Sequence, residues 1–378
     1  MNKALPRKLL IAAALSTFFV VSIISPVSAT TKRDAILNFV NGCFRAQDGY
    51  YGSLDRTPSS VTTLSSTHAA LNIIGILNPP LDADTYDHEY DINIFLTGIA
   101  NTTTGGYRNS KDGIERVEGT FYALSIARSL GINISSHMNK HAKFLLDSRN
   151  PNGGFGSSPE TNSSPSIINT YYAMKALDIA GNISQVNKSL VRDYVLSCRK
   201  GGTMFAGTSN STDVSIITTY YAVRLYKDFL TSYPDLDGTY LNMRAFIAGR
   251  LGASGGFSDP VVGSEPLLST TYYAVALCRD IGVSIPGGDE LTRQWILGKQ
   301  DHNGGFVEGE PPIATASVLA TSHAVGALFR ISSSLAELDV DTPWTLSQIA
   351  GAVAAVLILV GIVVLVIVAY YVHKRNRI

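Results

Sequence analysis

Apolar and polar segments alternate along the chain in a unit of about 50 residues, which occurs six times between residues 30 and 338. Each unit holds an aromatic residue next to or near a glycine, at Tyr50, Tyr107, Phe155, Phe205, Phe257 and Phe306. A second position holds Tyr or His followed by Ala, at His68, Tyr122, Tyr172, Tyr221, Tyr273 and His323. Two independent positions that keep one period predict six structural repeats.

Each repeat reads as a helix, a turn and a second helix. The segment 150–154 (Asn-Pro-Asn-Gly-Gly) is a turn sequence, because Asn, Pro and Gly supply turn conformations that other residues resist. The second helix opens in Ser or Thr and continues apolar, as in 269–277, and Gly131, Gly181 and Gly282 are placed to end three of these helices. No strand-length stretch alternates apolar and polar residues, so we expect an all-α protein without a sheet.

Helix pairs of this kind either stack into an open solenoid or close into a ring. An open solenoid needs polar capping repeats at its ends. The sixth repeat instead resembles the first, since both carry His-Ala at the second position and Gln-Asp before the glycine. We therefore predict a closed (α/α)6 toroid over residues 30–338, with twelve helices in two concentric layers.

The two ends of the chain have the composition of targeting segments. Residues 1–29 combine Lys3, Arg7 and Lys8 with an apolar run and small residues before Ala29, which predicts a signal peptide; an uncleaved anchor is the alternative. Residues 349–372 carry no charge and are long enough as a helix to cross a membrane. The basic residues in 373–378 predict a cytoplasmic tail, after a stalk at 339–348.

This topology places the toroid outside the cell or in a lumen, at a membrane. Six Asn-x-Ser/Thr sequences fit that location as glycosylation candidates, at Asn101, Asn133, Asn162, Asn182, Asn187 and Asn210. The chain has 30 Lys and Arg against 30 Asp and Glu, so a basic nucleic-acid-binding surface is not expected. Three cysteines, an odd number, argue against a disulfide framework.

The segment 300–306 (Gln-Asp-His-Asn-Gly-Gly-Phe), with the period and the Thr-Tyr-Tyr-Ala helices, resembles the repeat family of protein prenyltransferase β-subunits and squalene or terpene cyclases. The resemblance covers nearly all of residues 30–338 and implies an α/α toroid. It also implies that the second helix of each repeat lines a central cavity that holds an isoprenoid. His68, Tyr122, Tyr172, Tyr221, Tyr273 and His323 would then lie on or near the cavity wall.

The catalytic residues of that family are not found. Its prenyltransferases bind zinc through Asp, Cys and His. At the positions aligned with the Asp or His ligand, this chain has Ser65, Gly119, Asn169, Thr218, Thr270 and Ala320. At the positions aligned with the Cys ligand, it has Thr67, Phe121, Tyr171, Tyr220, Tyr272 and Ser322. The Asp-x-Asp-Asp acid of the cyclases is also missing. We therefore predict neither a metal site nor a cofactor.

Two other sets of residues are candidates for chemistry. His68 and His323 share a column and would become neighbours in a closed ring, as a metal or proton-transfer pair or simply as packed substitutes for Tyr. Glu265 and Glu308 are the first pair to consider for a glycosidase, since some (α/α)6 barrels use two facing carboxylates. Solvated loop residues are the alternative. Adjacent pairs such as Tyr171-Tyr172 should send one ring between the helix layers and the other toward the cavity or a neighbouring inner helix.

These patterns leave three classes of function open. The first hypothesis is a membrane-anchored, externally displayed toroid that binds an unknown ligand or protein at its cavity or rim, without prenyl transfer. The second is an enzyme of the toroid superfamily that acts on a lipid or a glycan. A purely structural role, as a surface-layer or adhesion module, is a third possibility.

Overall fold

A computed structural model describes residues 31–54, 60–79, 81, 86–160, 163–230, 237–259, 264–309 and 315–340. The chain divides into residues 35–335 and a smaller unit made of residues 1–34 and 336–378. In the smaller unit, the Lys32 N–H donates to the Val340 carbonyl at 3.1 Å, and Arg33 pairs with Asp339 at 2.7 Å. The predicted signal peptide, membrane helix and tail lie outside the described residues, as does most of the stalk.

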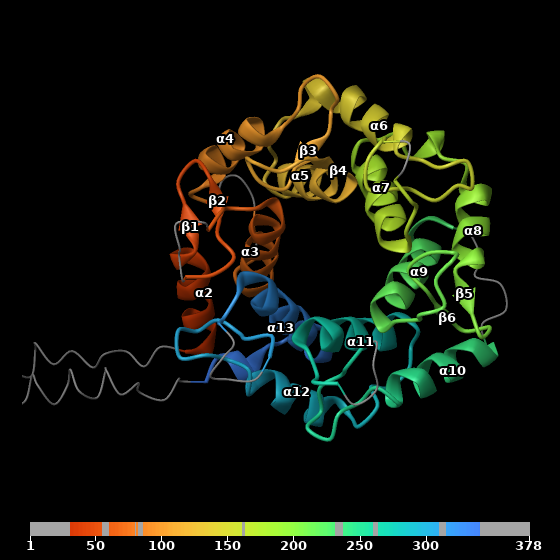
Figure 1. The fold of residues 1–378 in the computed structure, drawn as a ribbon. Helices are drawn as coiled ribbons and strands as arrows, with labels where there is room; N and C mark the ends of the chain where they lie inside the picture. Colours follow the sequence, from red (N-terminus) through yellow and green to blue (C-terminus); the bar gives the residue numbers. More distant parts are fainter. Residues whose placement is uncertain are drawn as a thin grey trace, which may run out of the picture. The chain divides into compact units, whose positions relative to one another are not determined.

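Twelve α-helices occur in the described residues and alternate between an outer and an inner ring (Figure 1). The outer helices are α2 (Lys32–Gly42), α4 (Glu89–Ile99), α6 (Met138–Asp147), α8 (Lys188–Ser197), α10 (Asp237–Ala248) and α12 (Asp289–Leu297). The inner helices are α3 (Leu64–Leu77), α5 (Val117–Ser129), α7 (Ile167–Ile179), α9 (Ile216–Phe229), α11 (Leu268–Asp280) and α13 (Val318–Ile331). Short 3₁₀ turns are η1 (Ser135–His137), η2 (Ile183–Gln185) and η3 (Ala336–Leu338). The α/α toroid of twelve helices is confirmed.

The ring closes between the sixth repeat and the first. Each inner helix contacts the next one along the chain, and α13 contacts α3 (Figure 1). The Val318 N–H at the start of α13 donates to the Gly52 carbonyl of the first repeat at 2.8 Å. On the outer side, Gly304 packs so closely on α2 that an added Cβ would lie 2.1 Å from the Ala35 carbonyl oxygen.

The expectation of a protein without strands is wrong in detail. Three antiparallel pairs of two-residue strands occur in the described residues: β1 (Phe44–Arg45) with β2 (Gly49–Tyr50), β3 (Tyr107–Arg108) with β4 (Glu115–Arg116), and β5 (Arg199–Lys200) with β6 (Met204–Phe205). In β1–β2 and β5–β6 the strands flank the turn before the repeating aromatic residue, and in β3–β4 they flank the loop that follows it. Such pairs are too short to produce an alternating pattern, so the sequence carries no signal for them.

A threonine in each inner helix holds the turn that precedes it. The backbone N–H of the repeating aromatic residue donates to the hydroxyl oxygen of this threonine at 2.9 to 3.1 Å in all six repeats. The threonines are Thr67, Thr120, Thr170, Thr219, Thr271 and Thr321, and all are buried. Since a buried N–H without a partner is costly, these bonds fix the aromatic side chain in the core between the layers.

The inner helices begin at Ser or Thr caps and at contacts from the next repeat. Thr63, Ser166, Ser215 and Ser317 each accept the N–H three residues ahead, as N-cap residues do. In α9 and α11 a carboxylate of the following repeat adds a further cap. Asp259 accepts the Ile216 N–H at 2.8 Å, and Glu308 accepts the Ser269 N–H at 2.9 Å.

Glycines and cysteines follow the sequence expectations. Gly131, Gly181 and Gly282 end α5, α7 and α11 with φ of +65°, +71° and +72°, a conformation that favours glycine. Cys43, Cys198 and Cys278 are buried and are not joined in disulfides, and burial raises the pKa of the Cys278 thiol to about 12. They are packing residues.

Candidate functional site

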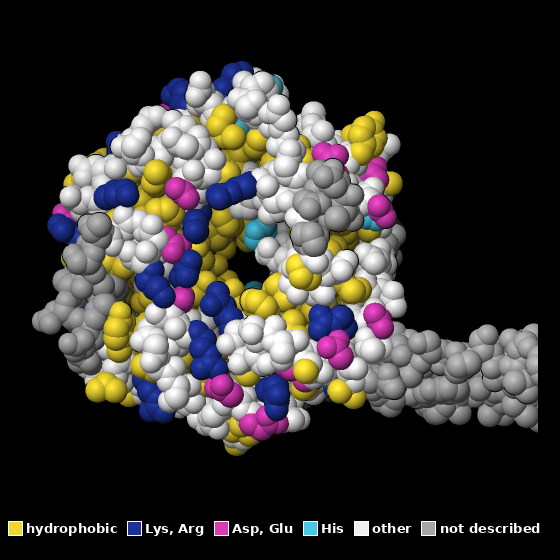
Figure 2. All heavy atoms as spheres, turned by 180° about the vertical axis from the view of Figure 1, so that it is seen from behind, with side chains coloured by type: hydrophobic (Ala, Val, Ile, Leu, Met, Phe, Trp, Pro, Cys, Tyr) yellow, Lys and Arg dark blue, Asp and Glu magenta, His cyan; other side chains and the backbone are white. Residues whose placement is uncertain are grey.

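A cavity of about 370 Å³ lies at the centre of the inner ring. All six inner helices contribute to its wall, which consists mainly of aromatic side chains. Figure 2 shows hydrophobic side chains inside the opening, and Lys and Arg side chains beside its rim. Among the described residues that line the cavity, no side chain is a carboxylate.

The six residues of the repeated Tyr/His position all line this cavity: His68, Tyr122, Tyr172, Tyr221, Tyr273 and His323. The expectation that only one tyrosine of each adjacent pair faces the cavity is wrong, because Tyr171, Tyr220 and Tyr272 line it as well. Their rings lie against tyrosine rings of the neighbouring inner helix, with Tyr171 and Tyr221 centroids 5.2 Å apart. Both positions reach the wall because closing the ring brings the inner helices side by side.

The alignment of His68 with His323 is wrong by one residue. The buried threonine lies four residues after the N-cap in each inner helix, at Thr67 in α3 and at Thr321 in α13. His68 follows its threonine directly, whereas His323 comes two residues after its own. His68 therefore belongs to the column of Tyr171, and Ala69 takes the place equivalent to His323.

The two imidazoles pack against tyrosines of the inner ring. His68 lies 5.0 Å from Tyr122 between ring centroids, and its Nδ1 is 3.2 Å from the Asn72 amide nitrogen. His323 stacks on Tyr272 at 5.5 Å, and its Nδ1 is buried without a hydrogen-bond partner. Burial lowers the pKa of His68 to about 4 and also lowers the pKa of His323. Both rings are therefore neutral at neutral pH.

Four tyrosine hydroxyls form a chain along the cavity wall. Tyr122 donates to the Glu118 carboxylate at 3.2 Å. The hydroxyl oxygens of Tyr122 and Tyr172 are 3.4 Å apart, those of Tyr172 and Tyr221 2.9 Å, and those of Tyr221 and Tyr273 2.8 Å. Burial raises the pKa of all four phenols, so they stay protonated.

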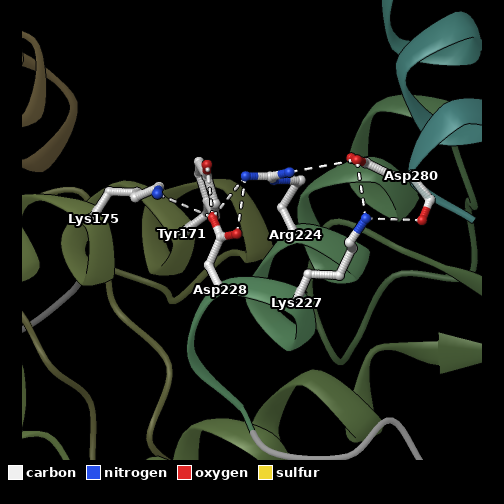
Figure 3. Close-up of polar contacts among 6 residues, drawn as sticks. All are labelled: Tyr171, Lys175, Arg224, Lys227, Asp228 and Asp280. Atoms are coloured by element: carbon white, nitrogen blue, oxygen red, sulfur yellow. Dashed lines mark hydrogen bonds and ion pairs between the residues drawn. The ribbon is translucent and has the colours of Figure 1, made fainter.

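Charged residues link the inner helices α7, α9 and α11 beside Tyr171 (Figure 3). Asp228 of α9 accepts from the Tyr171 hydroxyl at 3.4 Å and pairs with Lys175 of α7 at 3.1 Å. Arg224 bridges Asp228 at 2.9 Å and Asp280 of α11 at 3.4 Å. Because each of these two carboxylates meets two cations, with Lys227 also on Asp280 at 3.2 Å, the cluster ties the helices together.

The two candidate carboxylates have different surroundings. Glu308 accepts both the N–H and the hydroxyl of Ser269, so it caps the N-terminus of α11. Glu265 is exposed in the loop before that helix. Neither residue lines the cavity. The structure thus gives Glu308 a structural role, and neither carboxylate faces the cavity among the described residues.

The Asn-x-Ser/Thr sites differ in how their amide groups are used. Asn133, Asn187 and Asn210 are exposed. The Asn101 side-chain nitrogen donates to Glu115 at 2.9 Å, and that of Asn182 donates to the Ala180 carbonyl at 2.8 Å. Asn162 lies outside the described residues.

The described residues contain neither a cluster of metal ligands nor a membrane-spanning helix. No group of three His, Cys, Asp or Glu side chains in this part of the chain is arranged to hold a metal ion. No helix within it is long and apolar enough to cross a membrane, and the predicted segment 349–372 is not among these residues. When the inner helices are aligned on their buried threonines, His68 rather than Thr67 takes the position that corresponds to the zinc-binding cysteine of the prenyltransferases.

Solved structures with the same fold include enzymes of two kinds. The type II terpene cyclase MstE from Scytonema is 13% identical, with a TM-score of 0.59, over 80% of this chain and 97% of the cyclase. A complex of this cyclase with the substrate geranylgeranyl dihydroxybenzoate is 14% identical, with a TM-score of 0.57, over 79% and 96%. A glycosidase is 13% identical, with a TM-score of 0.52, over 78% and 94%. At these identities the similarity concerns the fold.

Comparison of the sequence with curated proteins finds no similar protein. The family model of the prenyltransferase alpha-alpha toroid domain, in contrast, matches residues 12–167, 115–308 and 287–358. These matches span most of the chain and agree with the repeats, the closed ring and the cavity of the structure. The chain therefore belongs to the prenyltransferase α/α toroid family.

Proposed function

We propose that the protein is a membrane-anchored, externally displayed toroid that binds a neutral, largely apolar ligand in its central cavity and does not transfer prenyl groups. The observation that carries this proposal is the composition of the cavity wall. It combines aromatic rings, hydroxyls and two neutral imidazoles, without a carboxylate among the described lining residues. Such a wall suits binding better than acid catalysis.

The size and polarity of the cavity define the class of ligand. A volume of about 370 Å³ is within the range of small-molecule sites. Aromatic faces favour an apolar body, and the tyrosine hydroxyls favour a single polar group. A charged group bound below the rim would lose hydration without meeting an opposite charge among the described lining residues, so a neutral ligand is favoured.

The cyclase with the same fold supports an elongated apolar ligand, since its structure contains geranylgeranyl dihydroxybenzoate. The same chemistry is not expected here. The sequence lacks the Asp-rich acid of the cyclases and the zinc ligands of the transferases. For a glycan substrate, two facing carboxylates would be needed, yet Glu308 serves as a helix cap and Glu265 lies on the exposed surface.

Membrane anchoring and external display rest on the sequence of the two ends. The uncharged segment 349–372 and the basic tail motivate this part of the proposal. We expect a protease added to intact cells to remove the toroid and leave a short membrane-bound tail. A toroid that becomes accessible only after the cells are permeabilised would contradict the proposed topology.

Ligand binding is tested with the full chain and decanol, a neutral molecule with an apolar body and one hydroxyl. We expect saturable binding by calorimetry, and we expect Ser322→Phe to abolish it because Ser322 lines the cavity. Ser189→Phe, at an exposed position of α8, is the matched control. Binding that Ser322→Phe leaves unchanged would place the ligand outside the cavity and refute the proposal.

Transfer activity is tested with geranylgeranyl diphosphate, a thiol peptide and zinc. We expect no thioether product from the full chain under conditions in which it binds decanol. A thioether formed at a rate proportional to the protein concentration would show that it is a transferase.

A further inference from the structure

The tyrosine chain has a direction, which follows from counting its protons. Four hydrogen bonds link Glu118, Tyr122, Tyr172, Tyr221 and Tyr273 in series. Four hydroxyl protons are available for them, because each tyrosine has one and an ionised carboxylate has none. All four bonds form only if every hydroxyl donates toward Glu118.

The opposite direction is disfavoured by the charge at the start of the chain. If Tyr122 donated to Tyr172, its lone pairs would face the Glu118 carboxylate and that carboxylate would lose a hydrogen bond. The negative charge of Glu118 also acts on Tyr172 and Tyr273 further along the chain. Glu118 is half-buried and does not line the cavity, so it acts through Tyr122.

The hydrogen-bonded series that begins at Glu118 ends at the hydroxyl oxygen of Tyr273. This tyrosine lines the cavity and is only partly buried. When every hydroxyl donates toward Glu118, the proton of Tyr273 is used in the bond to Tyr221. The nearby His323 contacts it through the ring, with centroids 5.8 Å apart. Tyr273 therefore presents an oxygen that can accept a hydrogen bond from a ligand but has no proton to donate.

We propose that Glu118 orients the four hydroxyls and thereby selects ligands that carry a hydrogen-bond donor, a hydroxyl or an N–H, over equally apolar ligands that carry only acceptors. This inference rests on the proposed function, because it names the polar group of the ligand held in the same cavity. Tyr273 makes the contact, and Glu118 is a positioning residue.

The selection is tested by comparing decanol with decyl methyl ether, which has the same kind of oxygen but no proton. We expect wild-type protein to bind the alcohol about fivefold to tenfold more tightly than the ether, the effect of one hydrogen bond. Tyr273→Phe should bring this ratio close to one by removing the acceptor. Glu118→Gln should lower the ratio in the same way, since an amide can donate to Tyr122 and allow the chain to reverse.

Glu115→Gln is the matched control for the charge change. Glu115 lies in β4, three residues before Glu118, and accepts from the Asn101 amide. It does not line the cavity, and we expect the wild-type ratio in this variant. A ratio near one in the wild type, or a ratio that Glu118→Gln leaves unchanged, would overturn the inference.

A measurement without ligand tests the orientation by itself. The infrared C–O stretch of a phenol depends on whether its hydroxyl donates or accepts, and Tyr273→Phe identifies the band of Tyr273 by difference. We expect a donor-only band in the wild type that shifts in Glu118→Gln and stays in place in Glu115→Gln. A band that Glu118→Gln does not shift would refute the role of Glu118. If the band shifts but neither probe binds, the ligand inference fails together with the proposed function, while the orientation stands.

Discussion

One buried threonine in each inner helix both fills the core and makes hydrogen bonds through its hydroxyl group. Its hydroxyl oxygen accepts the N–H of the aromatic residue in the turn, and its hydroxyl proton in Thr67, Thr120, Thr170 and Thr321 goes to the carbonyl four residues earlier. A valine of the same shape would leave the buried N–H of the turn without a partner. The threonine therefore links the inner helix to the turn as well as filling the core.

This role predicts a clear difference between two substitutions. Thr219→Val removes the acceptor of the Phe205 N–H, and we expect it to lower the free energy of unfolding by about 1–3 kcal/mol. Thr219→Ser keeps the hydroxyl and should cost less. Chemical unfolding of the full chain measures both, and equal losses in the two variants would show that the hydrogen bond does not contribute.

The cavity histidine His68 makes stability depend on pH. Burial lowers its pKa to about 4 in the folded state, compared with about 6.5 in an unfolded chain. Between these values the unfolded state binds more protons, so stability rises with pH from about 4 to about 6.5 and is lost on acidification.

We expect His68→Gln to flatten the dependence of the unfolding free energy on pH within this window. His302→Gln, at a side chain that is 82% exposed, is the control and should keep the wild-type slope. A slope between pH 4 and pH 6.5 that is the same in all three proteins would contradict a lowered pKa of His68 in the folded state.

At the scale of the helices, the start of an inner helix is completed by the repeat that follows it. Asp259 and Glu308 cap α9 and α11, and the corresponding contacts of α5, α7 and α13 come from backbone carbonyls of Ser157, Gly207 and Gly52. Two of these contacts are therefore made by loop carboxylates. A carboxylate at a helix N-terminus is stabilised by the helix dipole, so a loop acid in this fold has a structural function to be considered before catalysis.

Substituting the two candidate carboxylates distinguishes these functions. We expect Glu308→Gln to lower the free energy of unfolding by about 1 kcal/mol, since it weakens a charged cap. Glu265→Gln should leave the stability within about 0.5 kcal/mol, because the residue is exposed. Binding of decanol should be unchanged in both. A loss of stability in Glu265→Gln as large as that in Glu308→Gln would contradict this assignment.

At the scale of the whole toroid, one glycine marks the closure of the ring. Gly304 has φ of +92°, and its Cα faces the Ala35 carbonyl of α2. Gly131 has a similar conformation, with φ of +65°, but an added Cβ there meets open space. Substituting each glycine therefore distinguishes the cost of backbone strain, which both positions have, from the cost of disturbing the contact that closes the ring, which only Gly304 makes.

We expect Gly304→Ala to cost more than about 2 kcal/mol, because strain and a clash with backbone add together. Gly131→Ala should cost about 1 kcal/mol from strain alone. Thermal unfolding of the two variants provides the comparison. Equal costs would mean that the first and sixth repeats are not packed together in solution.

The family and the α/α toroid could be predicted from the sequence because both depend on local signals that recur six times. Pairs of Gly and aromatic residues mark the turns, and Ser or Thr marks the start of four inner helices. The alignment failed by one residue at His68, since the residue types alone made His68 resemble His323. The buried threonine gives the correct alignment, but its importance becomes visible only with the hydrogen bond that it accepts.

The sequence by itself determined the repeat and the helices, because period and helix geometry are properties of neighbouring positions in the chain. Only the tertiary structure decided that Tyr122, Tyr172, Tyr221 and Tyr273 share one chain of hydroxyls, and that Glu308 caps a helix of the preceding repeat. Those contacts join residues that are 39 to 52 positions apart. They exist because the ring brings adjacent repeats to within hydrogen-bond distance, which no local pattern specifies.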